Sequence, residues 1–315
     1  MKAIHTLTVS PSGQHIAYLK GQPERLTLGL LDTLNPDHEP VELWTDLRCS
    51  QPYMAVVWNA DSTAVYIAKD NDNWFHDVWR VDVKTHETTS VTGYFHTNTY
   101  PIMMHPKRPE MLCMSDLRGE LNVRLLNLDS GEMRKITDYA TPVKTAVYSP
   151  DGGQIAYTAN ATDNQHNADM YIMNADGFNK RKELSTLAGT FDIVRAWSSN
   201  GRFLAVDSNF EGGWRSGIYD LRNASLKWFT PAWEKAQALG FSPDSKHLLI
   251  NTENGVAIYE TRSARPHTIS SVTANHAVWL DNNQVVFTTG ELEIGVYSMK
   301  THRVELFNMK SASGE

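Results

Sequence analysis

The sequence predicts an all-β fold, a seven-bladed β-propeller built from four-stranded antiparallel blades. Three observations support this prediction: a hairpin that recurs seven times, a second strand pair after each hairpin, and two columns of matching residues. The hairpin is clearest at Ala146–Asn160, where two apolar strands flank a Ser-Pro-Asp-Gly turn. Proline presets the backbone of such a turn and aspartate bonds its local N–H groups. The copies follow one another at roughly 38–49 residues, a spacing typical of propellers.

A second pair of strands follows each hairpin and completes a four-stranded unit. In chain order these pairs lie at Arg25–Asp32 with Val41–Thr45, Asp77–Thr92, Asn122–Thr137, Met170–Ser185, Ser216–Thr230, Gly255–Ser270 and Ile294–Asn308. Short polar turns such as Asp129-Ser130-Gly131 separate the two strands of a pair. Four strands in each of seven units predict seven complete blades.

Two columns of residues fix the register of the blades. The residue before the hairpin turn is Val9, Trp58, Met104, Tyr148, Trp197, Phe241 and Trp279. The residue that ends the fourth strand is Thr45, Thr92, Thr137, Ser185, Thr230, Ser270 and Asn308. Large side chains at one depth suit blades that stack face to face. Hydroxyl groups at the end of the fourth strand suit hydrogen bonds to nearby backbone. Both columns therefore indicate structure rather than function.

The chain begins on the first strand of one blade and ends on the fourth strand of another. We therefore expect a propeller closed without strand exchange, in which packing between blades one and seven forms the seam. Trp279 should be buried near that seam. We expect one domain over residues 1–309, followed by a frayed polar tail over residues 310–315.

Charge and composition exclude several classes of partner. The 315 residues carry a formal net charge of −7, so no basic field attracts nucleic acid. No apolar run reaches the roughly 20 residues of a membrane span, and the amino terminus lacks a signal sequence. These features predict a cytoplasmic protein that binds neither nucleic acid nor membrane. Cys49 and Cys113 are the two cysteines and are expected to be buried thiols without a bridge.

Motif searches find none of the patterns expected for metal, phosphate or dinucleotide sites. The sequence contains no H-E-x-x-H, no paired C-x-x-C, no phosphate loop and no dinucleotide fingerprint. The run Asp70–Asn73 resembles part of a calcium loop in composition but lacks its glycine and distal glutamate, so we interpret it as a solvated loop. We expect no cofactor, no metal and no catalytic residue from these patterns.

The long loops predict where ligands bind. In an antiparallel blade the second-to-third loops and the blade-to-blade crossings share one face, and the long loops of this sequence fall on it. The same face receives the start of each first strand, which lines the predicted channel. The candidate binding residues are His5, Tyr53, Trp74, Phe75, His76, Tyr100, Lys144, Arg195, Trp214, Arg215, Gln237 and His276.

The repeats resemble those of known propeller families. Residues 149–185, with SPDGGQIAYTAN and MYIMNADGFNKRKELS, resemble the repeat of TolB-like propellers. Residues 70–92 and 115–137 resemble propeller domains of the prolyl oligopeptidase family just as closely. An oligopeptidase would add a hydrolase domain with G-x-S-x-G, and this sequence contains no such motif. The resemblance extends over nearly the whole chain and implies a fold rather than an activity.

Two hypotheses of function follow. The first is a non-catalytic module that binds a protein or peptide through the long-loop face, or that gates a hydrolase as its propeller domain. The alternative is an enzyme similar to oligogalacturonate lyases, with a metal or acid/base site in the channel and a carbohydrate ligand. A cluster of three convergent ligands would favour the alternative, and the sequence shows none around His267 and His276.

Overall fold

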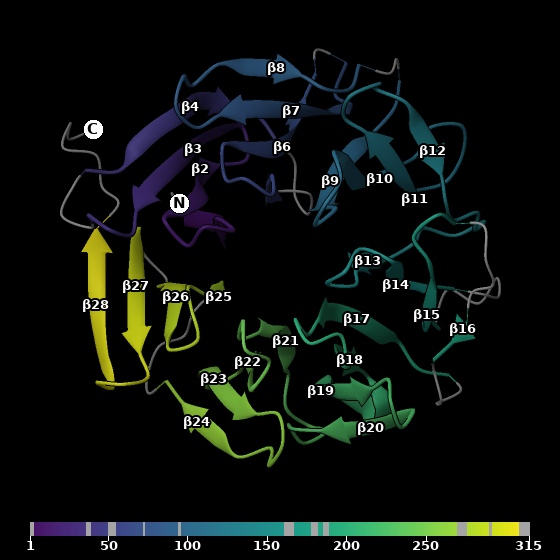
Figure 1. Ribbon diagram of the computed structural model, residues 1–315, viewed down its shortest axis with the longest axis vertical. Coiled ribbons are helices and arrows are strands. Elements are labelled where there is room, and N and C mark those ends of the chain that lie inside the picture. Colours follow the sequence, from purple (N-terminus) through teal and green to yellow (C-terminus); the bar gives the residue numbers. More distant parts are fainter. Residues whose placement is uncertain are drawn as a thin grey trace. The chain divides into compact units, whose positions relative to one another are not determined.

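The computed structural model describes residues 3–35, 39–49, 55–71, 73–93, 96–160, 167–177, 182–184, 189–269, 276–289 and 292–308. Seven four-stranded antiparallel sheets make up the described chain, each with its strands in sequence order (Figure 1). The predicted fold class, an all-β seven-bladed propeller, is confirmed. The candidate residue Tyr53 and the tail 310–315 lie outside the described residues.

The first four blades have the following bounds. Blade 1 contains β1 (Ala3–Val9), β2 (His15–Gln22), β3 (Arg25–Asp32) and β4 (Val41–Leu47). Blade 2 contains β5 (Val56–Trp58), β6 (Ala64–Asp70), β7 (His76–Asp82) and β8 (Thr88–Ser90). Blade 3 contains β9 (Thr99–Met104), β10 (Glu110–Ser115), β11 (Asn122–Asn127) and β12 (Met133–Lys135). Blade 4 contains β13 (Thr145–Tyr148), β14 (Gln154–Ala159), β15 (Asp169–Asn174) and β16 (Lys182–Glu183).

The last three blades follow the same plan. Blade 5 contains β17 (Asp192–Trp197), β18 (Phe203–Ser208), the 3-10 turn η1 (Phe210–Gly212), β19 (Arg215–Asp220) and β20 (Ser225–Trp228). Blade 6 contains β21 (Gln237–Phe241), β22 (His247–Thr252), β23 (Gly255–Glu260) and β24 (Pro266–Thr268). Blade 7 contains β25 (Ala277–Trp279), β26 (Gln284–Thr288), β27 (Glu293–Ser298) and β28 (Arg303–Asn308).

The first residue column lies where the sequence predicts, whereas Thr92, Thr137 and Thr230 of the second column lie two residues beyond the fourth strands, which end at Ser90, Lys135 and Trp228. Each residue of the first column, from Val9 to Trp279, is the last residue of the first strand of its blade. In the second column, the hydroxyls of Thr92, Thr137 and Thr230 each accept a backbone N–H from the start of the third strand at 2.9 Å. Thr45 departs from the pattern, because β4 runs on to Leu47 with register shifts against β3. Ser185 and Ser270 lie outside the described residues.

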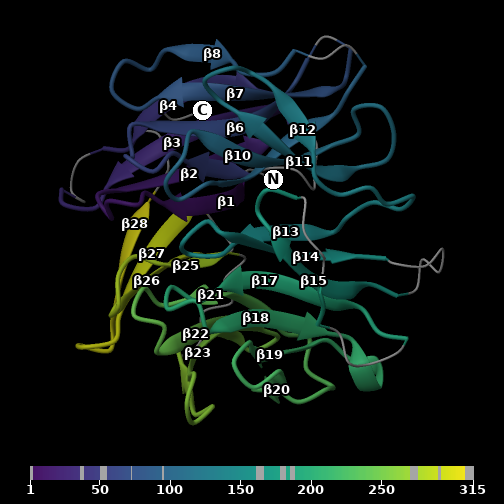
Figure 2. The ribbon, with the colours of Figure 1, turned by 45° about the vertical axis from the view of Figure 1, so that its right-hand side comes forward.

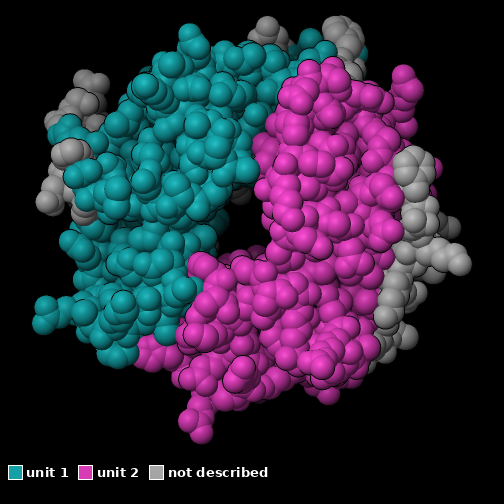
Figure 3. Space-filling model, viewed as in Figure 1, with its two compact units in different colours: residues 1–101, 272–315 teal, residues 102–271 magenta. Residues whose placement is uncertain are grey.

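The chain divides into two compact units, drawn in different colours in Figure 3. Unit 1 comprises residues 1–101 and 272–315, and unit 2 comprises residues 102–271, so the division falls within β9. The prediction of one domain over residues 1–309 is not tested by this division.

Unit 1 contains the seam between blades 1 and 7. Both blades consist of contiguous sequence, as predicted, and no strand is exchanged between them in the described chain. Ile4 and Leu7 of blade 1 pack in one apolar cluster with Val286 and Ile294 of blade 7. Trp279 is buried at the end of β25. Burial of apolar side chains, rather than backbone pairing, therefore joins these two blades.

Unit 2 is held together by apolar contact between successive blades, which lie stacked in Figure 2. Met170 and Leu184 of blade 4 pack against Val194 and Leu204 of blade 5. Blade 5 packs in the same way against blade 6 through a second cluster that includes Leu248. The apolar packing between blades 4, 5 and 6 holds their strands in place, and the strands in turn support the loops at their ends. Among the described residues, no helix has the length and apolar character needed to span a membrane.

Candidate functional sites

The predicted site residues of unit 1 fall into three groups. His76 and Tyr100 are buried and in contact, with 3.1 Å between His76 Nδ1 and the tyrosine hydroxyl. His5 bonds the carbonyl of Gly21 at 2.9 Å. Burial first, and the charge of His5 second, lower the pKa of His276. Trp74 and Phe75 lie in the loop between β6 and β7. Their roles as binding residues stay a prediction.

The predicted residues of unit 2 are not all equally available to a ligand. Lys144 and Gln237 are exposed at the starts of β13 and β21. Trp214 is half-buried and accepts the Ala236 N–H at its carbonyl, 3.1 Å away. Arg215 is stacked between the rings of Phe210 and Trp228, at 4.9 and 4.2 Å from their centroids. Within unit 2, Arg215 is therefore already engaged by its own blade.

Arg195 belongs to a buried network in blade 5, which we call the blade-5 network and which consists of Arg195, Asp207 and Ser216. Arg195 Nε donates to Asp207 Oδ2 at 2.6 Å, and Ser216 donates its hydroxyl to Asp207 Oδ1. The Ala238 N–H from blade 6 donates to the same oxygen at 2.9 Å. The Asp207 side chain is fully buried. Burial raises the pKa of Asp207, and Arg195 and the hydrogen bonds oppose that effect.

A second buried polar group lies in unit 1, at the end of blade 2. The blade-2 cluster consists of Cys49, Asp70 and His76, all buried, whose sulfur, oxygen and nitrogen atoms lie within 4.8 Å of one another. His76 Nε2 is 2.8 Å from Asp70 Oδ1. Burial, followed by the charge of Asp70, raises the pKa of the Cys49 thiol to about 12. The cluster therefore contains a neutral thiol beside an imidazole and a carboxyl group.

Local backbone structure brings these three residues together. Asp70 ends β6 and His76 begins β7, and the two are cross-strand partners in the ladder. The Asp70 N–H donates to the carbonyl of Arg48 at 2.8 Å. This bond holds the crossing from blade 1 beside the β6–β7 hairpin and so places Cys49 near Asp70 and His76. His76 Nδ1 lies 2.9 Å from Asn98 Oδ1 and also contacts Tyr100. The reading of Asp70–Asn73 as a solvated loop is wrong for Asp70, because strand pairing buries it.

The loop between Asp70 and His76 exposes a tryptophan. Trp74 is 72% exposed and has a positive φ of 65°, a conformation that is uncommon for a bulky residue. Its ring is covered on one side by the guanidinium of Arg48, 4.3 Å from the centroid. Asn71 closes the loop, since its side-chain oxygen accepts the N–H groups of Asn73 and Phe75. Trp74 therefore projects between two residues, Asn73 and Phe75, whose backbone N–H groups are bonded to Asn71.

Unit 2 has a comparable feature that sequence reasoning missed. Trp233, in the crossing from blade 5 to blade 6, is 79% exposed. This crossing packs so closely on the β18–β19 loop that a Cβ on Gly213 would meet the carbonyl oxygen of Ala232 at 1.8 Å. Only glycine fits there. A lone tryptophan between Ala232 and Glu234 carries no repeat signal, so the sequence pattern did not reveal its exposure.

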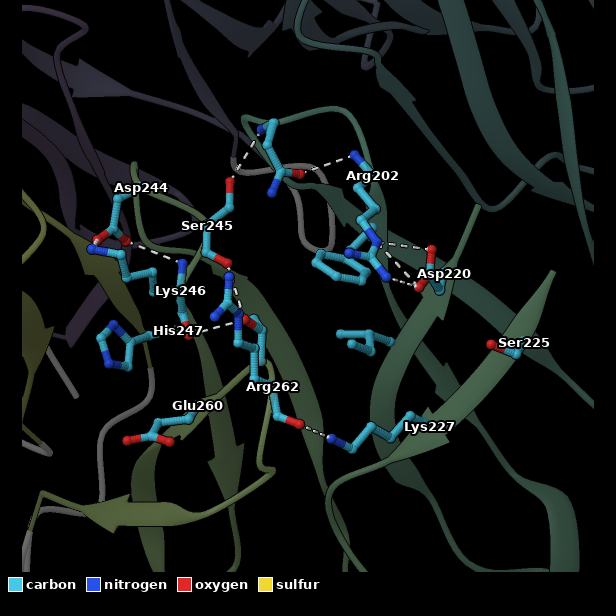
Figure 4. Close-up of a pocket in the computed structure, with 14 residues that line it drawn as sticks. Arg202, Asp220, Ser225, Lys227, Asp244, Ser245, Lys246, His247, Glu260 and Arg262 are labelled. Carbon is cyan, nitrogen blue, oxygen red and sulfur yellow. Dashed lines mark hydrogen bonds and ion pairs between the residues drawn. The ribbon is translucent and has the colours of Figure 1, made fainter. Parts of the chain in front are cut away.

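The cavity of Figure 4 lies at the other end of blades 5 and 6, among the short turns. Its volume is about 620 Å³, and its lining carries charges of both signs. Arg202 donates from Nε to Asp220 Oδ1 and from Nη2 to Oδ2, a bidentate pair that lowers the pKa of that carboxyl. Lys246 lies 3.1 Å from Asp244, and Lys227 donates to the carbonyl of Arg262. Because these cations have partners within the cavity wall, the cavity offers no field of a single sign.

Comparison with known proteins shows what the fold is similar to. No family model matches the sequence, and no curated protein matches it. Among solved structures, a Mycobacterium tuberculosis puromycin-hydrolyzing peptidase matches 100% of this chain at 17% identity and a TM-score of 0.77. The chain covers 54% of that peptidase, so it spans about half its length.

Two further structures resemble the chain. TolB from Acinetobacter baumannii matches 100% of the chain and 64% of its own at 17% identity, with a TM-score of 0.59. An oligogalacturonate lyase in complex with manganese matches 91% of the chain and 86% of its own at 15% identity, with a TM-score of 0.70. Identities this low show the fold alone. The resemblance to TolB-like and prolyl oligopeptidase-type propeller domains is thus confirmed for the fold.

Proposed function

We propose that the protein is a non-catalytic module that binds a protein or peptide through loops at the long-loop ends of its blades. The observation that carries this proposal is the presentation of Trp74, which is 72% exposed in the β6–β7 loop with Arg48 stacked on its ring. Single exposed apolar residues are common on protein surfaces, so exposure alone would carry little weight. The backbone conformation of Trp74 is a second observation that supports a binding role.

A bulky residue such as tryptophan rarely adopts a positive φ, so the surrounding structure must hold Trp74 in this conformation. Such a conformation costs of order 1–3 kcal/mol and persists where the surroundings enforce it, often at binding sites. The loop of Trp74 is enforced by the Asn71 side chain and by the β6–β7 ladder on both sides. Tryptophan and arginine are the residues most enriched at the centres of protein interfaces. The Trp74–Arg48 pair therefore supplies a rigid amphipathic anchor.

Trp233 in unit 2 supports the same function independently. It lies on a blade-to-blade crossing, which belongs to the long-loop end of blade 5, and the close approach at Gly213 fixes that crossing. A side chain carried by a fixed backbone segment loses less conformational entropy on binding than one carried by a segment that must first be ordered. Trp74 thus lies on a loop that the sequence predicts for binding, and Trp233 lies on a crossing at the corresponding end of its own blade.

The structural neighbours extend the proposal to a role beside a second domain. The puromycin-hydrolyzing peptidase is matched over 54% of its chain, and so are 54% and 55% of two further puromycin hydrolase structures. A propeller that accounts for about half of a hydrolase suits the gating role that the sequence suggests. Three convergent ligands, Cys49, Asp70 and His76, do occur among the described side chains, but Asp70 and His76 lie on β6 and β7 rather than on the first strands that line the predicted channel, so the group does not favour a lyase site in the channel.

Peptide selection tests the binding proposal. A display library of random peptides is selected against the full chain, and the affinity of a recovered peptide is measured for the Trp74→Ala and Trp233→Ala variants. Loss of an interface anchor should weaken binding at least about tenfold, or 1.4 kcal/mol, for one of the two variants. Leu34→Ala is the matched control, because Leu34 is 68% exposed at the short-turn end of blade 1.

Folding is measured on the same variants by urea titration. Substitution of an exposed side chain should change the free energy of unfolding by less than about 0.5 kcal/mol. If the peptide binds both tryptophan variants as tightly as the parent protein, or if Leu34→Ala weakens binding to the same extent, the long-loop ends are not the binding surface.

A further inference from the structure

We propose that Cys49, Asp70 and His76 form a binding site for a divalent transition-metal ion, with Zn²⁺ as the best fit. The three side chains come from two separate segments of unit 1 and place one sulfur, one oxygen and one nitrogen atom within 4.8 Å of one another. Neither the fold comparison nor the predicted function requires such a site. It rests on the blade-2 cluster alone and is independent of the proposed binding function.

The geometry lies close to that of a bound ion. Zinc–ligand bonds of about 2.0–2.3 Å at tetrahedral angles place ligand atoms roughly 3.3–3.6 Å apart. The blade-2 cluster has one shorter separation, 2.8 Å between His76 Nε2 and Asp70 Oδ1, and no separation above 4.8 Å. Side-chain rotations that open the first separation by about half an ångström, and that bring any longer one, at most 4.8 Å, to about 3.6 Å, would give the three protein ligands zinc spacing.

The donor set selects the type of metal. Imidazole nitrogen, thiolate sulfur and carboxylate oxygen together suit borderline ions such as Zn²⁺, whereas Mg²⁺ and Ca²⁺ prefer oxygen ligands alone. When the ion binds, the Cys49 S–H bond breaks, a sulfur–metal bond forms and the proton passes to solvent. The ion would then neutralise both the thiolate and the Asp70 carboxylate, which lie buried in the described chain.

The surroundings of His76 also match those of a metal-ligating histidine. Such a histidine commonly donates its second ring N–H to a neighbouring oxygen, which orients the ring. Here Nδ1 lies 2.9 Å from Asn98 Oδ1, an acceptor. With the proton on Nδ1, the lone pair of Nε2 faces Asp70 Oδ1 at 2.8 Å. In that tautomer a proton or a metal ion bridges the two atoms, whereas in the other tautomer Tyr100 donates its hydroxyl to Nδ1 at 3.1 Å and Nε2 donates to Asp70.

The position of the cluster gives the ion a structural effect. Asp70 and His76 bound the loop that carries Trp74, and Arg48, next to Cys49, stacks on the Trp74 ring. A metal ion at this point would tie the β6–β7 loop to the crossing from blade 1. Binding to the folded state alone would also raise the thermal stability of the protein.

Cobalt substitution tests the proposal directly. The full chain is stripped with a chelator and titrated with Co²⁺, whose bond to a thiolate produces an intense near-ultraviolet charge-transfer band. We expect this band to saturate at one ion per chain. Cys113→Ala is the matched control, because Cys113 is the other cysteine and is buried in blade 3. The band should persist in Cys113→Ala and disappear in Cys49→Ala, and His76→Ala should weaken Co²⁺ binding at least about tenfold.

The outcomes separate a metal site from a proton-mediated pair. The proposal is overturned if the parent protein shows no charge-transfer band at about tenfold molar excess of Co²⁺. It is also overturned if Cys113→Ala abolishes the band while remaining folded by circular dichroism. If Cys49→Ala does not fold, a band retained in Cys113→Ala still identifies Cys49 as the sulfur ligand, because the chain has two cysteines.

Discussion

Two buried carboxylates, Asp70 in blade 2 and Asp207 in blade 5, lie in different chemical surroundings. Asp207 accepts from a guanidinium, a hydroxyl and a backbone N–H, which all carry their protons at neutral pH. Asp70 lies beside an imidazole and a thiol, which can each give up a proton and offer a lone pair. Both are buried, yet only one is surrounded by groups that can become metal ligands.

This difference shows how to distinguish a structural network from a candidate site. A carboxylate whose neighbours are permanent donors is satisfied within the fold, and a ligand would have to break those bonds. A carboxylate beside an imidazole nitrogen and a thiol is stabilised when a cation binds among the three groups. Arg195, a predicted binding residue, is one of the permanent donors to Asp207, whereas His76 is the imidazole beside Asp70.

The largest expected effect is the loss of the Asp207 charge. Asp207→Asn should lower the free energy of unfolding by roughly 3 kcal/mol, the low end of the range for breaking a buried ion pair, because Arg195 keeps some access to water. Urea titration at neutral pH measures it. Lys235→Ala is the control, since the exposed Lys235–Glu253 pair should contribute less than about 1 kcal/mol. Equal effects would mean that the blade-5 network does not stabilise the fold.

The loss of unfolding free energy caused by the corresponding substitution in blade 2, Asp70→Asn, should depend on whether a metal ion is bound. In chelator-treated protein, Asp70→Asn should cost roughly 1–2 kcal/mol, because the amide can still bond His76. With saturating Zn²⁺ the difference in unfolding free energy between parent and variant should widen, since the parent alone gains the binding energy. Parallel urea titrations in chelator and in Zn²⁺ measure both values. A difference that is the same in both conditions would contradict a metal site.

A glycine pair tests the rigidity of the Trp233 crossing. Gly213→Ala should cost roughly 1–3 kcal/mol, because the new methyl group meets the Ala232 carbonyl and one of the two loops must move. Gly93→Ala is the control, as a Cβ there has no neighbour within 4 Å among the described residues. Its effect should stay within about 0.5 kcal/mol. Thermal unfolding of both variants gives the comparison, and similar losses would show that the crossing is loosely packed.

The smallest effect concerns an aspartate in a turn of blade 2. The Thr85 N–H, the Arg80 side chain and the Lys84 N–H lower the pKa of Asp82 to about 2. A lowered carboxyl pKa gives stability that is present above about pH 4 and is lost as the pH falls toward 2. Asp82→Asn should therefore destabilise the protein by roughly 1 kcal/mol at pH 7, a value reduced by solvent screening. The difference from the parent protein should shrink as the pH falls through about 2 and vanish below it, and a pH-independent difference would refute this cause.

The repeat pattern predicted most of the fold because its signals are local. Every large residue of the first column ends its strand, and three hydroxyls of the second column make the same bond. Local turn chemistry and strand alternation determine such positions, so a single sequence reveals them. The failure at Thr45 arises from register shifts in β4, which depend on the pairing partner rather than on β4 itself.

The candidate sites were harder to predict because they depend on separate segments. Cys49 was correctly expected to be buried, but nothing in its local sequence places it beside Asp70 and His76. Asp70 occurs in a polar run whose composition suggests solvent exposure, and only the cross-strand pairing with His76 buries it. The exposure of Trp233 likewise follows from the contact of its crossing with Gly213 rather than from a motif.

The most direct measurement of the central contrast is the X-ray absorption spectrum of the Zn²⁺-loaded full chain at the zinc edge. If the blade-2 cluster is a metal site, the first coordination shell should contain one sulfur at about 2.3 Å and nitrogen or oxygen ligands at about 2.0–2.2 Å. The sulfur scatterer should persist in Cys113→Ala. A shell of nitrogen and oxygen alone in the parent protein would show that Cys49 does not bind the ion and that the blade-2 cluster, like the blade-5 network, is structural.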